Sequence, residues 1–338
     1  MTIRGSDNHV SRQHAGRPNQ VAVVIGGANV DVKARSSAAV TPGTSNPGST
    51  YSSAGGVGRN IAENLARLGT RTSLLASIGT DAFGEQLLGQ TSAAGVLVDN
   101  VLRSKAPTGT YTAVLDHDGE LVVAVSDMKA VEELDPAYVL SSKDLIASAS
   151  FLVLDGNLRL DVVTTALDLA QSASIPVLID PVSDVKAQAL AAALLQQRPI
   201  FVITPNRSEL AALTSLPTRT DAQIGAAAAV LHNAGVTNVW VSLGERGSLL
   251  FSANEPSAAV TLFDISDTAA RVVDVTGAGD AMVGGLVHAL LDGRSLEAGI
   301  HFAHAAAALN IESPETVRAD TSSLAVDARL RRNTSIES

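Results

Sequence analysis

The stretch that decides the fold is Asp274-Val275-Thr276-Gly277-Ala278-Gly279-Asp280, because a β-like run ends just before it and a long apolar segment follows it. We predict a strand over residues 271–273, a turn at the glycines and a helix that starts at about Gly277. The unpaired N–H groups and the dipole of a helix start favour an anion such as phosphate. The carboxylate of Asp280 would repel a phosphate that is simply bound there. It suits a base that takes a proton from a hydroxyl group attacking the phosphorus, as in phosphoryl transfer.

Three other interpretations compete with this one. A dinucleotide fingerprint needs glycine or alanine where this chain has Met282, and it belongs near the start of a domain rather than near its end. A P-loop needs a Gly-Lys pair, which the sequence lacks. The third is a glycine-rich turn capped by Asp274 or Thr276, with Asp280 as a solvated acid. That interpretation would be preferred for an isolated Gly-x-Gly, and the further motifs described below count against it.

The composition excludes several classes of protein. With 338 residues, of which 46% are hydrophobic and 17% charged, the chain can bury a sizeable core. Its formal net charge is −10 and it has no dense run of Lys or Arg, so we expect no nucleic-acid partner. The absence of cysteine excludes disulfides, thiolate metal sites and thiol catalysis, and it fits a reducing compartment.

The sequence also gives expectations about location. No apolar run reaches the roughly 20 residues that span a bilayer, so we expect no membrane partner. Residues 1–18 are polar and lack the apolar segment of a secretory signal, so we expect a disordered tail there. Arg4, Arg12 and Arg17 leave a targeting segment open as the alternative. Together these features predict a cytoplasmic protein.

After residue 20, short β-rich runs alternate with segments of helical periodicity. The expected strands are 21–26, 72–78, 151–154, 176–180, 200–203, 238–243, 248–252 and 259–263. The expected helices are 58–68, 82–94, 161–173, 187–197, 206–213 and 221–234. Gly69 is placed to end the first of these helices, and Thr220 with Gln223 forms a capping-box pattern at the start of the last. This alternation predicts a parallel sheet covered by helices on both faces.

Two segments break the alternation. Residues 32–54 are polar, rich in Ser, Thr, Gly and Pro, and have no helical face. Residues 108–128 contain a hairpin pattern, in which runs 111–115 and 121–125 flank a turn at Asp118-Gly119. Both segments are therefore expected to be β-rich additions to the alternating core.

Four further motifs accompany the glycine-rich stretch. They are Val23-Val24-Ile25-Gly26-Gly27-Ala28-Asn29-Val30-Asp31, Gly55-Gly56-Val57-Gly58-Arg59-Asn60, Thr204-Pro205-Asn206-Arg207-Ser208-Glu209 and Val241-Ser242-Leu243-Gly244-Glu245-Arg246-Gly247. In kind and in order, the set resembles the ribokinase-like (PfkB-type) family of carbohydrate kinases over nearly the whole chain. The resemblance implies an α/β fold, with a three-layer α/β/α core, a mostly parallel sheet and a small β lid. The kinase domain would span residues 19–335, and segments 32–54 and 108–128 would form the lid.

The resemblance also implies residue roles. Asp280 corresponds to the family's catalytic base, beside an anion hole of Gly277, Ala278 and Gly279. The implied acceptor-binding residues are Asp31, Asn29, Gly55, Gly56, Asn60, Asn46 and Thr112. The implied ATP-binding residues are Lys186, Asn206, Ser242, Gly244 and Thr276. Glu209 would hold Mg²⁺ through water, and Asp274 with carbonyls after residue 305 would hold a monovalent cation such as K⁺.

Several of these residues keep a second interpretation. Asp31 follows the first strand, where ligands of open α/β sheets bind, and its carboxylate could accept two bonds from a furanose diol. Asn60 could cap a helix, Asn46 could simply form the Asn-Pro-Gly turn, and Glu209 could be an ordinary acid at a helix start. Lys186 could be an exposed lysine. His301 and His304 have the spacing of a metal pair, but with no third ligand they are interpreted as structural.

Within the family, several segments resemble the pseudouridine kinases. They are 26–31, 45–48, 55–65, 110–112 with 126–128, 180–183 and 275–282. This resemblance implies that ATP phosphorylates the 5′-hydroxyl of pseudouridine, and that two copies associate through the lid. Two alternatives stay open: a kinase for another acceptor, such as ribose or a purine nucleoside, and a sensor without catalytic activity.

Overall fold

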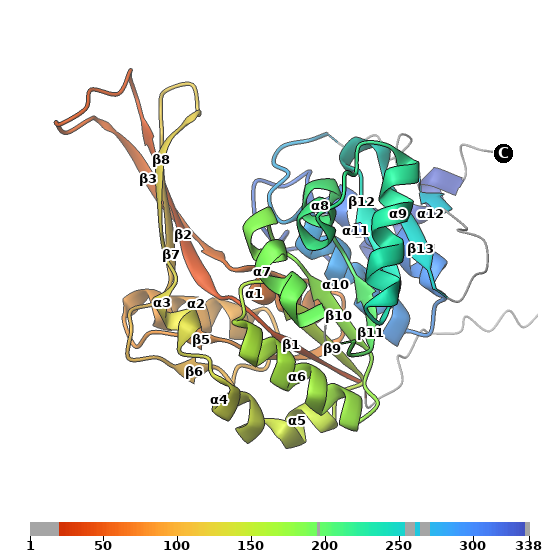
Figure 1. Cartoon of the computed structure of the whole chain (residues 1–338). Helices are drawn as coiled ribbons and strands as arrows, with labels where there is room; N and C mark the ends of the chain where they lie inside the picture. The colour runs from red at the N-terminus through yellow and green to blue at the C-terminus, as the bar shows by residue number, and fades with distance from the viewer. Residues whose placement is uncertain (1–19, 195–196, 254–260, 264–270, 335–338) are drawn as a thin grey trace, which may run out of the picture.

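A computed structural model describes residues 20–194, 197–253, 261–263 and 271–334 of the chain (Figure 1). The predicted tail at 1–18 lies outside these residues. Within them, no helix combines the length and the apolar content needed to cross a bilayer.

An eight-stranded sheet forms the centre of the molecule. Its strand order is β14-β13-β12-β11-β10-β9-β1-β4; the six strands from β12 to β4 run parallel, β13 pairs antiparallel with β12, and β14 pairs antiparallel with β13. Its strands are β1 (Val21–Ile25), β4 (Arg71–Leu75), β9 (Phe151–Asp155), β10 (Val177–Asp180), β11 (Ile200–Ile203), β12 (Val236–Ser242), β13 (Ser248–Ser252) and β14 (Thr261–Phe263). The predicted, mostly parallel sheet is confirmed.

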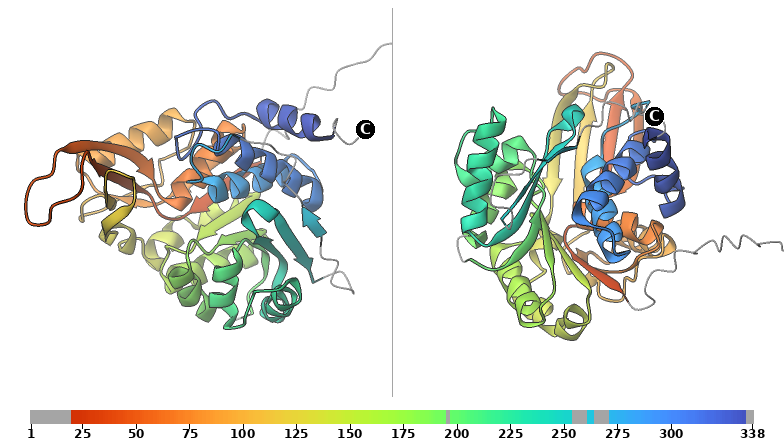
Figure 2. Two further views of the ribbon diagram at one scale, coloured as in Figure 1. Left: turned by 90° about the horizontal axis from the view of Figure 1, so that it is seen from above. Right: turned by 90° about the vertical axis from the view of Figure 1, so that its right-hand side faces the viewer.

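Helices cover both faces of this sheet, as Figure 2 shows. One face packs on α4 (Pro136–Ser141), α5 (Lys143–Ala147), α6 (Leu160–Ser172), α7 (Asp184–Leu194), α8 (Arg207–Thr214) and α9 (Asp221–Asn233). The other packs on α1 (Val57–Arg67), α2 (Ala82–Ala93), α10 (Ala278–Leu291) and α11 (Leu296–Asn310), with α12 (Ser323–Thr334) outside α11. Alternate residues of β1 explain the arrangement, because Val23 and Ile25 join the first core and Ala22 and Val24 join the second.

A second, smaller sheet projects from the core and is called the lid below (Figure 1). Its strands are β2 (Asn29–Ser36), β3 (Gly48–Gly55), β7 (Thr110–Leu115) and β8 (Leu121–Asp127), in the order β3-β2-β7-β8. The predicted hairpin is the β7–β8 pair. Near the base of the lid lie β5 (Ser77–Ile78), β6 (Leu102–Arg103) and the short α3 (Lys129–Glu132).

The helix boundaries predicted from the sequence are confirmed at two places, whereas one predicted strand is wrong. Gly69 follows α1 with φ +99°, and Thr220 and Gln223 form the predicted reciprocal capping box of α9. The strand predicted at 271–273 is wrong, because this segment is irregular and Val272 and Val273 are 61% and 51% exposed. Its valines lie on the surface, whereas the strands of the parallel sheet are buried. Of the predicted strand 259–263, only 261–263 falls in the described residues.

Candidate active site

Polar groups gather at one edge of the central sheet. Asp155, Asp180 and Ser242 end the neighbouring parallel strands β9, β10 and β12, and Asn206 follows β11. Asn206 and Ser242 are joined directly by a β-bridge, with the Ser242 N–H donating to the Pro205 carbonyl at 3.0 Å. Ligands of open α/β sheets bind at this carboxyl edge. The motifs that are far apart in the sequence therefore meet where a ligand is expected.

Asp280 lies in the first turn of α10 and is only 8% exposed. Its Oδ2 accepts a hydrogen bond from Asn60 Nδ2 of α1 at 2.7 Å. The two helices approach closely because α10 carries Gly284, where a Cβ would lie 2.7 Å from Asn64 Cβ. The bond fixes one oxygen of the carboxylate, so the other oxygen remains available to a substrate hydroxyl.

The surroundings of Asp280 tune its proton affinity. Burial raises the pKa of the Asp280 carboxyl from 3.8 to about 7, the Asn60 bond opposes this, and the charge of Asp155 adds to it. A general base works best when its pKa lies near the working pH. Asp280 therefore has the properties of a proton acceptor for a hydroxyl group at neutral pH.

The start of α10 is open at the position where the sequence predicts an anion hole. Gly277 has φ +78°, and a Cβ on it would overlap the Thr316 carbonyl, so glycine is required there. The Ala278 N–H donates to the Val275 carbonyl at 3.2 Å, and its place in the anion hole stays a prediction. Among the described residues, the N–H groups of Gly277 and Gly279 have no such bond. A Cβ on Gly279 would meet no atom within 4 Å, so space for an anion lies beside it.

The expected acceptor site is partly assembled. Asn29 Nδ2 donates to Asp31 Oδ1 at 2.7 Å, and a Cβ on Gly55 would lie 2.5 Å from Asp31 Oδ2. Gly56 has φ +94°, and a Cβ there would lie 2.5 Å from the Gly27 carbonyl. Asn29 and Gly55 thus lie directly against the Asp31 carboxylate at the base of the lid, while Gly56 packs on Gly27. Asn60 binds Asp280, so its side chain does not cap the helix.

Two residues predicted to bind the acceptor lie elsewhere. Thr112 pairs with Val32 in the lid, one position from the Asp31–Tyr111 pair. Because alternate residues of a strand face opposite ways, Thr112 is on the face away from Asp31. Asn46 holds its own loop, since its amide accepts from the Thr41 N–H at 2.8 Å and donates to the Thr41 and Thr44 carbonyls. Neither side chain joins the Asp31 group in this structure.

On the ATP side, Asn206 and Glu209 form a reciprocal capping box at the start of α8. The Asn206 N–H donates to Glu209 Oε2 at 2.8 Å, which leaves Glu209 Oε1 for another partner. Burial raises the pKa of Glu209. Lys186 lies half-buried in the first turn of α7, and Gly244 begins a short 3₁₀ turn, η1 (Gly244–Arg246), beyond β12.

The segment expected to hold a monovalent cation is closed by hydrogen bonds. Asp274 Oδ1 accepts from the N–H and the hydroxyl of Thr276 at 2.8 and 2.7 Å. Asn310 Nδ2 donates to the carbonyls of Thr276 and Thr316 at 3.3 and 3.1 Å. An amide nitrogen thus stands between two of the carbonyls that a cation would use.

Sequence reasoning missed Asp155, which is fully buried. Its Oδ2 accepts from the N–H groups of Gly27 and Gly58, both at 2.8 Å, and so joins β1 to the start of α1. A Cβ on Gly26 would lie 2.5 Å from the same oxygen. The only signal in the sequence was an acid at the end of a fully apolar run.

The interpretation of His304 as structural agrees with its surroundings. It bonds Ser248 Oγ at 2.8 Å beside Trp240, and burial lowers its pKa to about 4, so it is neutral. His301, three residues earlier, is exposed.

A parallel α/β core, a projecting β lid and a buried carboxylate at an open helix start together define a small-molecule kinase. The sequence profile of pfkB family carbohydrate kinases matches residues 19–322, and the chain belongs to that family. Members of the family are ATP-dependent phosphotransferases that act on hydroxyl groups.

Individual relatives span most of the chain. A pseudouridine kinase of Escherichia coli (strain K12) is 33% identical over 314 residues, covering 90% of this chain and 95% of the relative. A ribokinase of Arabidopsis thaliana is 32% identical over 300 residues, covering 86% and 76%. The structure of Arabidopsis thaliana ribokinase complexed with ribose and ATP superposes with a TM-score of 0.81 at 26% identity, covering 93% of this chain and 99% of that chain.

Proposed function

We propose that this kinase transfers the γ-phosphoryl group of ATP to the 5′-hydroxyl of pseudouridine, giving ADP and pseudouridine 5′-phosphate. The observation that carries the chemistry is the buried Asp280 carboxylate, held by Asn60 beside the open start of α10. Support for the acceptor comes from the 33% identity with a pseudouridine kinase. The 32% identity with a ribokinase favours ribose as the second candidate.

In the proposed reaction, Asp280 takes the proton of the acceptor hydroxyl as that oxygen attacks the γ-phosphorus. The N–H groups of Gly277 and Gly279 then stabilise negative charge on the transferred group, which is commonly a large catalytic contribution. Asp31 accepts bonds from the ribose hydroxyls and thereby directs the 5′-hydroxyl towards Asp280. The lid limits the access of water, which would otherwise take the phosphoryl group.

The nucleotide is proposed to enter with Mg²⁺, which supplies positive charge to the phosphates when it is bound. The fit of this chain to the ion rests on hard carboxylate oxygens, since Glu209 Oε1 is uncommitted by the capping box. Asp180 adds a second carboxylate, whose pKa is raised well above its usual value by burial and by the charges of Asp280 and Glu209. Lys186, Asn206, Ser242, Gly244 and Thr276 are proposed to contact ATP.

A panel of acceptors tests the assignment. Pseudouridine, uridine, ribose and adenosine are compared at equal concentrations in a coupled assay of ADP release. We expect the highest kcat/KM with pseudouridine. A higher value for ribose or adenosine would transfer the assignment to that acceptor, and tight nucleoside binding without ADP release would favour the sensor interpretation.

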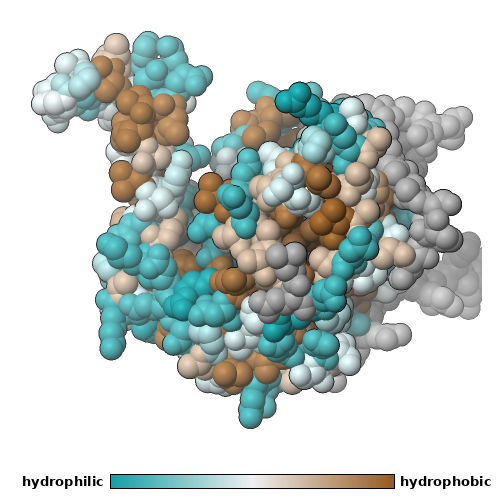
Figure 3. Space-filling model, in the orientation of Figure 1, coloured by the Kyte–Doolittle hydropathy of each residue, from teal (hydrophilic) through white to brown (hydrophobic). Residues whose placement is uncertain are grey.

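We also propose that two copies associate through the lid. The exposed apolar residues of β8 support this, with Val123 and Val125 52% and 63% exposed, and apolar side chains are visible on the lid in Figure 3. Sedimentation analysis of the wild type and of V125E gives the test. A dimer that the substitution dissociates would support the proposal, and a monomeric wild type would end it.

Activation by K⁺ is a further proposal from the same family resemblance, with Asp274 as ligand. Turnover in potassium chloride is compared with turnover in tetramethylammonium chloride at the same ionic strength. Equal rates would refute a cation at Asp274, and would agree with the bonds that Asn310 already makes there.

A further inference from the structure

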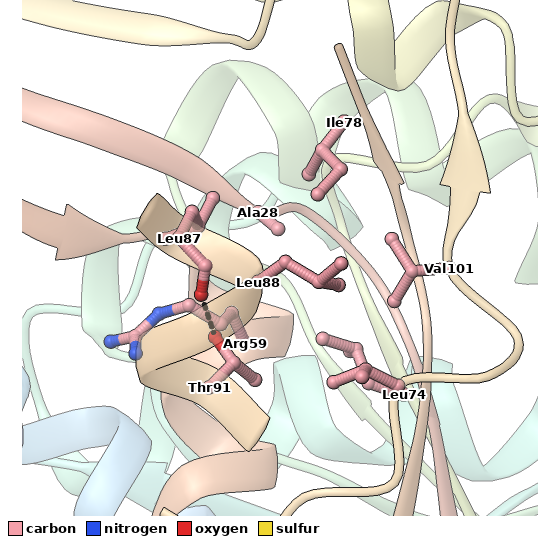
Figure 4. Close-up of a pocket in the computed structure, with 9 residues that line it drawn as sticks. Ala28, Arg59, Leu74, Ile78, Leu87, Leu88, Thr91 and Val101 are labelled. Atoms are coloured by element: carbon pink, nitrogen blue, oxygen red, sulfur yellow. Dashed lines mark hydrogen bonds between the residues drawn. The ribbon is translucent and has the colours of Figure 1, made fainter. Parts of the chain in front are cut away.

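Arg59 is the largest charged side chain in the interior near the site, with only 2% of its surface exposed. Its stem lines a cavity of about 10 Å³, roughly the space of one water molecule, among apolar residues of α2, β4 and the base of the lid (Figure 4). In Figure 4 the guanidinium group points away from those apolar residues. The cavity is too small for a ligand. The contacts that matter are therefore those that the buried guanidinium group of Arg59 makes on its other side.

The guanidinium group is held from three sides. Arg59 Nε donates to the Gly55 carbonyl at 3.1 Å, and Nη2 donates to the Ala54 carbonyl at 3.2 Å, both at the end of lid strand β3. Nη1 pairs with Glu63 one turn further along α1. Nη2 also donates to Asn60 Oδ1, on the residue that binds Asp280.

This last contact determines how the Asn60 amide is oriented. A guanidinium group has donors and no acceptor, so the atom of Asn60 that faces it must be the oxygen. The amide nitrogen of Asn60 must then face Asp280, as the 2.7 Å bond to Asp280 Oδ2 requires. With the amide reversed, a nitrogen would face the Arg59 donors and an oxygen would face the carboxylate, so both contacts would be repulsive.

We propose that Arg59 is a positioning residue for phosphoryl transfer: it fixes the Asn60 amide, and through it directs the free oxygen of Asp280 to the acceptor hydroxyl. The inference rests on the proposed role of Asp280 as general base. The same guanidinium group also binds two carbonyls of β3. It therefore connects the end of a lid strand to the general base, Asp280.

The charged groups facing Asp280 come from several elements. Asp155 at the end of β9, Asp31 on β2 and Asp180 at the end of β10 are acidic, and Arg59 on α1 is the cation among the groups that act on Asp280. Removing this cation while the carboxylates stay makes ionisation of Asp280 harder. The loss of Arg59 should therefore shift the acidic limb of the kcat profile, whereas a general loss of folding would lower kcat without such a shift.

The test compares R59M, R59K and the control R67M in steady-state assays with the acceptor of highest turnover. Arg67 pairs with the same Glu63 at 2.6 Å, but its side chain is 22% exposed and it makes no bond to Asn60. We expect R59M to lower kcat by about 10- to 100-fold, a part of the contribution of a general base. The KM for ATP should change by less than about twofold, and the acidic limb of the kcat profile should move to higher pH.

The conservative variant keeps the charge but not the planar group. An ammonium group presents its three donors from one point rather than from a planar fork that reaches Asn60 and the two lid carbonyls at once, so R59K should lower kcat by at least about fivefold while the acidic limb stays near that of the wild type. R67M should match the wild type in kcat and in pH profile.

The outcomes separate the two proposals. If D280N retains turnover, the role of Asp280 fails. If D280N is inactive while a folded R59M keeps the wild-type kcat and acidic limb, the inference about Arg59 alone is overturned. Should R59M fail to unfold cooperatively, R59K decides, because a wild-type kcat in R59K also overturns the inference.

Discussion

Replacing Asp280 with asparagine should inactivate the kinase and at the same time make the folded protein more stable above neutral pH. Loss of a general base is expected to lower kcat by about 100- to 10,000-fold. The asparagine keeps the shape of the side chain, and its amide oxygen can still accept the bond from Asn60, which spans 2.7 Å in the wild type. Binding of ATP should therefore change little.

The gain in stability follows from the raised pKa of Asp280. The folded value of about 7 exceeds the ordinary 3.8, so between these two pH values the folded protein binds more protons than the unfolded chain. Its free energy of unfolding must then fall as the pH rises through this window. A difference of about 3 pH units corresponds to about 4 kcal/mol once Asp280 is fully ionised, near pH 8.

The free energy of unfolding is measured in urea at pH 5 and pH 8, with fluorescence of the single, buried Trp240 as the signal. D280N should exceed the wild type by up to about 4 kcal/mol at pH 8 and by only about 1.5 kcal/mol at pH 5, because stability is lost progressively between pH 3.8 and about 7. D118N is the matched control, because the Asp118 side chain is 73% exposed and should show no such difference. A D280N protein with wild-type stability at both pH values and wild-type turnover would refute the reasoning about this residue.

Four further substitutions test the neighbouring groups. D31A removes a charged hydrogen-bond acceptor and should raise the KM for the acceptor about 10- to 100-fold with the KM for ATP nearly unchanged; a rise only in the KM for ATP would reverse the assignment. G277A, at φ +78°, should lower the melting temperature and the turnover, whereas G279A, whose new Cβ meets no atom within 4 Å, should lower turnover alone; equal melting temperatures would contradict this pairing. D155A should lower the free energy of unfolding by about 2–5 kcal/mol in urea, because it leaves two buried N–H groups unpaired; an unchanged value would show that water replaces the carboxylate.

The parts of the fold that depend on local chemistry could be predicted from the sequence. Gly69 after α1 and the Thr220–Gln223 capping box of α9 are found where their residue types indicate. The strand prediction at Arg271-Val272-Val273 was wrong, since a pair of adjacent valines has the same pattern in a strand and in an exposed loop.

The site was harder to predict where it depends on pairing between distant segments. Thr112 looked suitable by type, but the register of β7 against β2 sets its face, and no local pattern encodes that register. Asp155 was missed because the N–H groups it binds, on Gly27 and Gly58, are 128 and 97 residues away. Arg59 belongs to a motif that the sequence shows, yet the role proposed for it depends on a carboxylate 220 residues beyond its neighbour Asn60.

The row of acids at the carboxyl edge of the sheet has a consequence for the speed of nucleotide capture. Asp155, Asp180, Glu209 and Asp280 lie there in a chain whose formal charge is −10, and burial raises the pKa of each, so the negative charge that they present to a ligand grows as the pH rises. A polyphosphate without a counter-ion is repelled as it approaches, and dissolved salt weakens that repulsion. Nucleotide association should thus quicken as ionic strength rises, the opposite of an enzyme that attracts its anionic ligand from a distance.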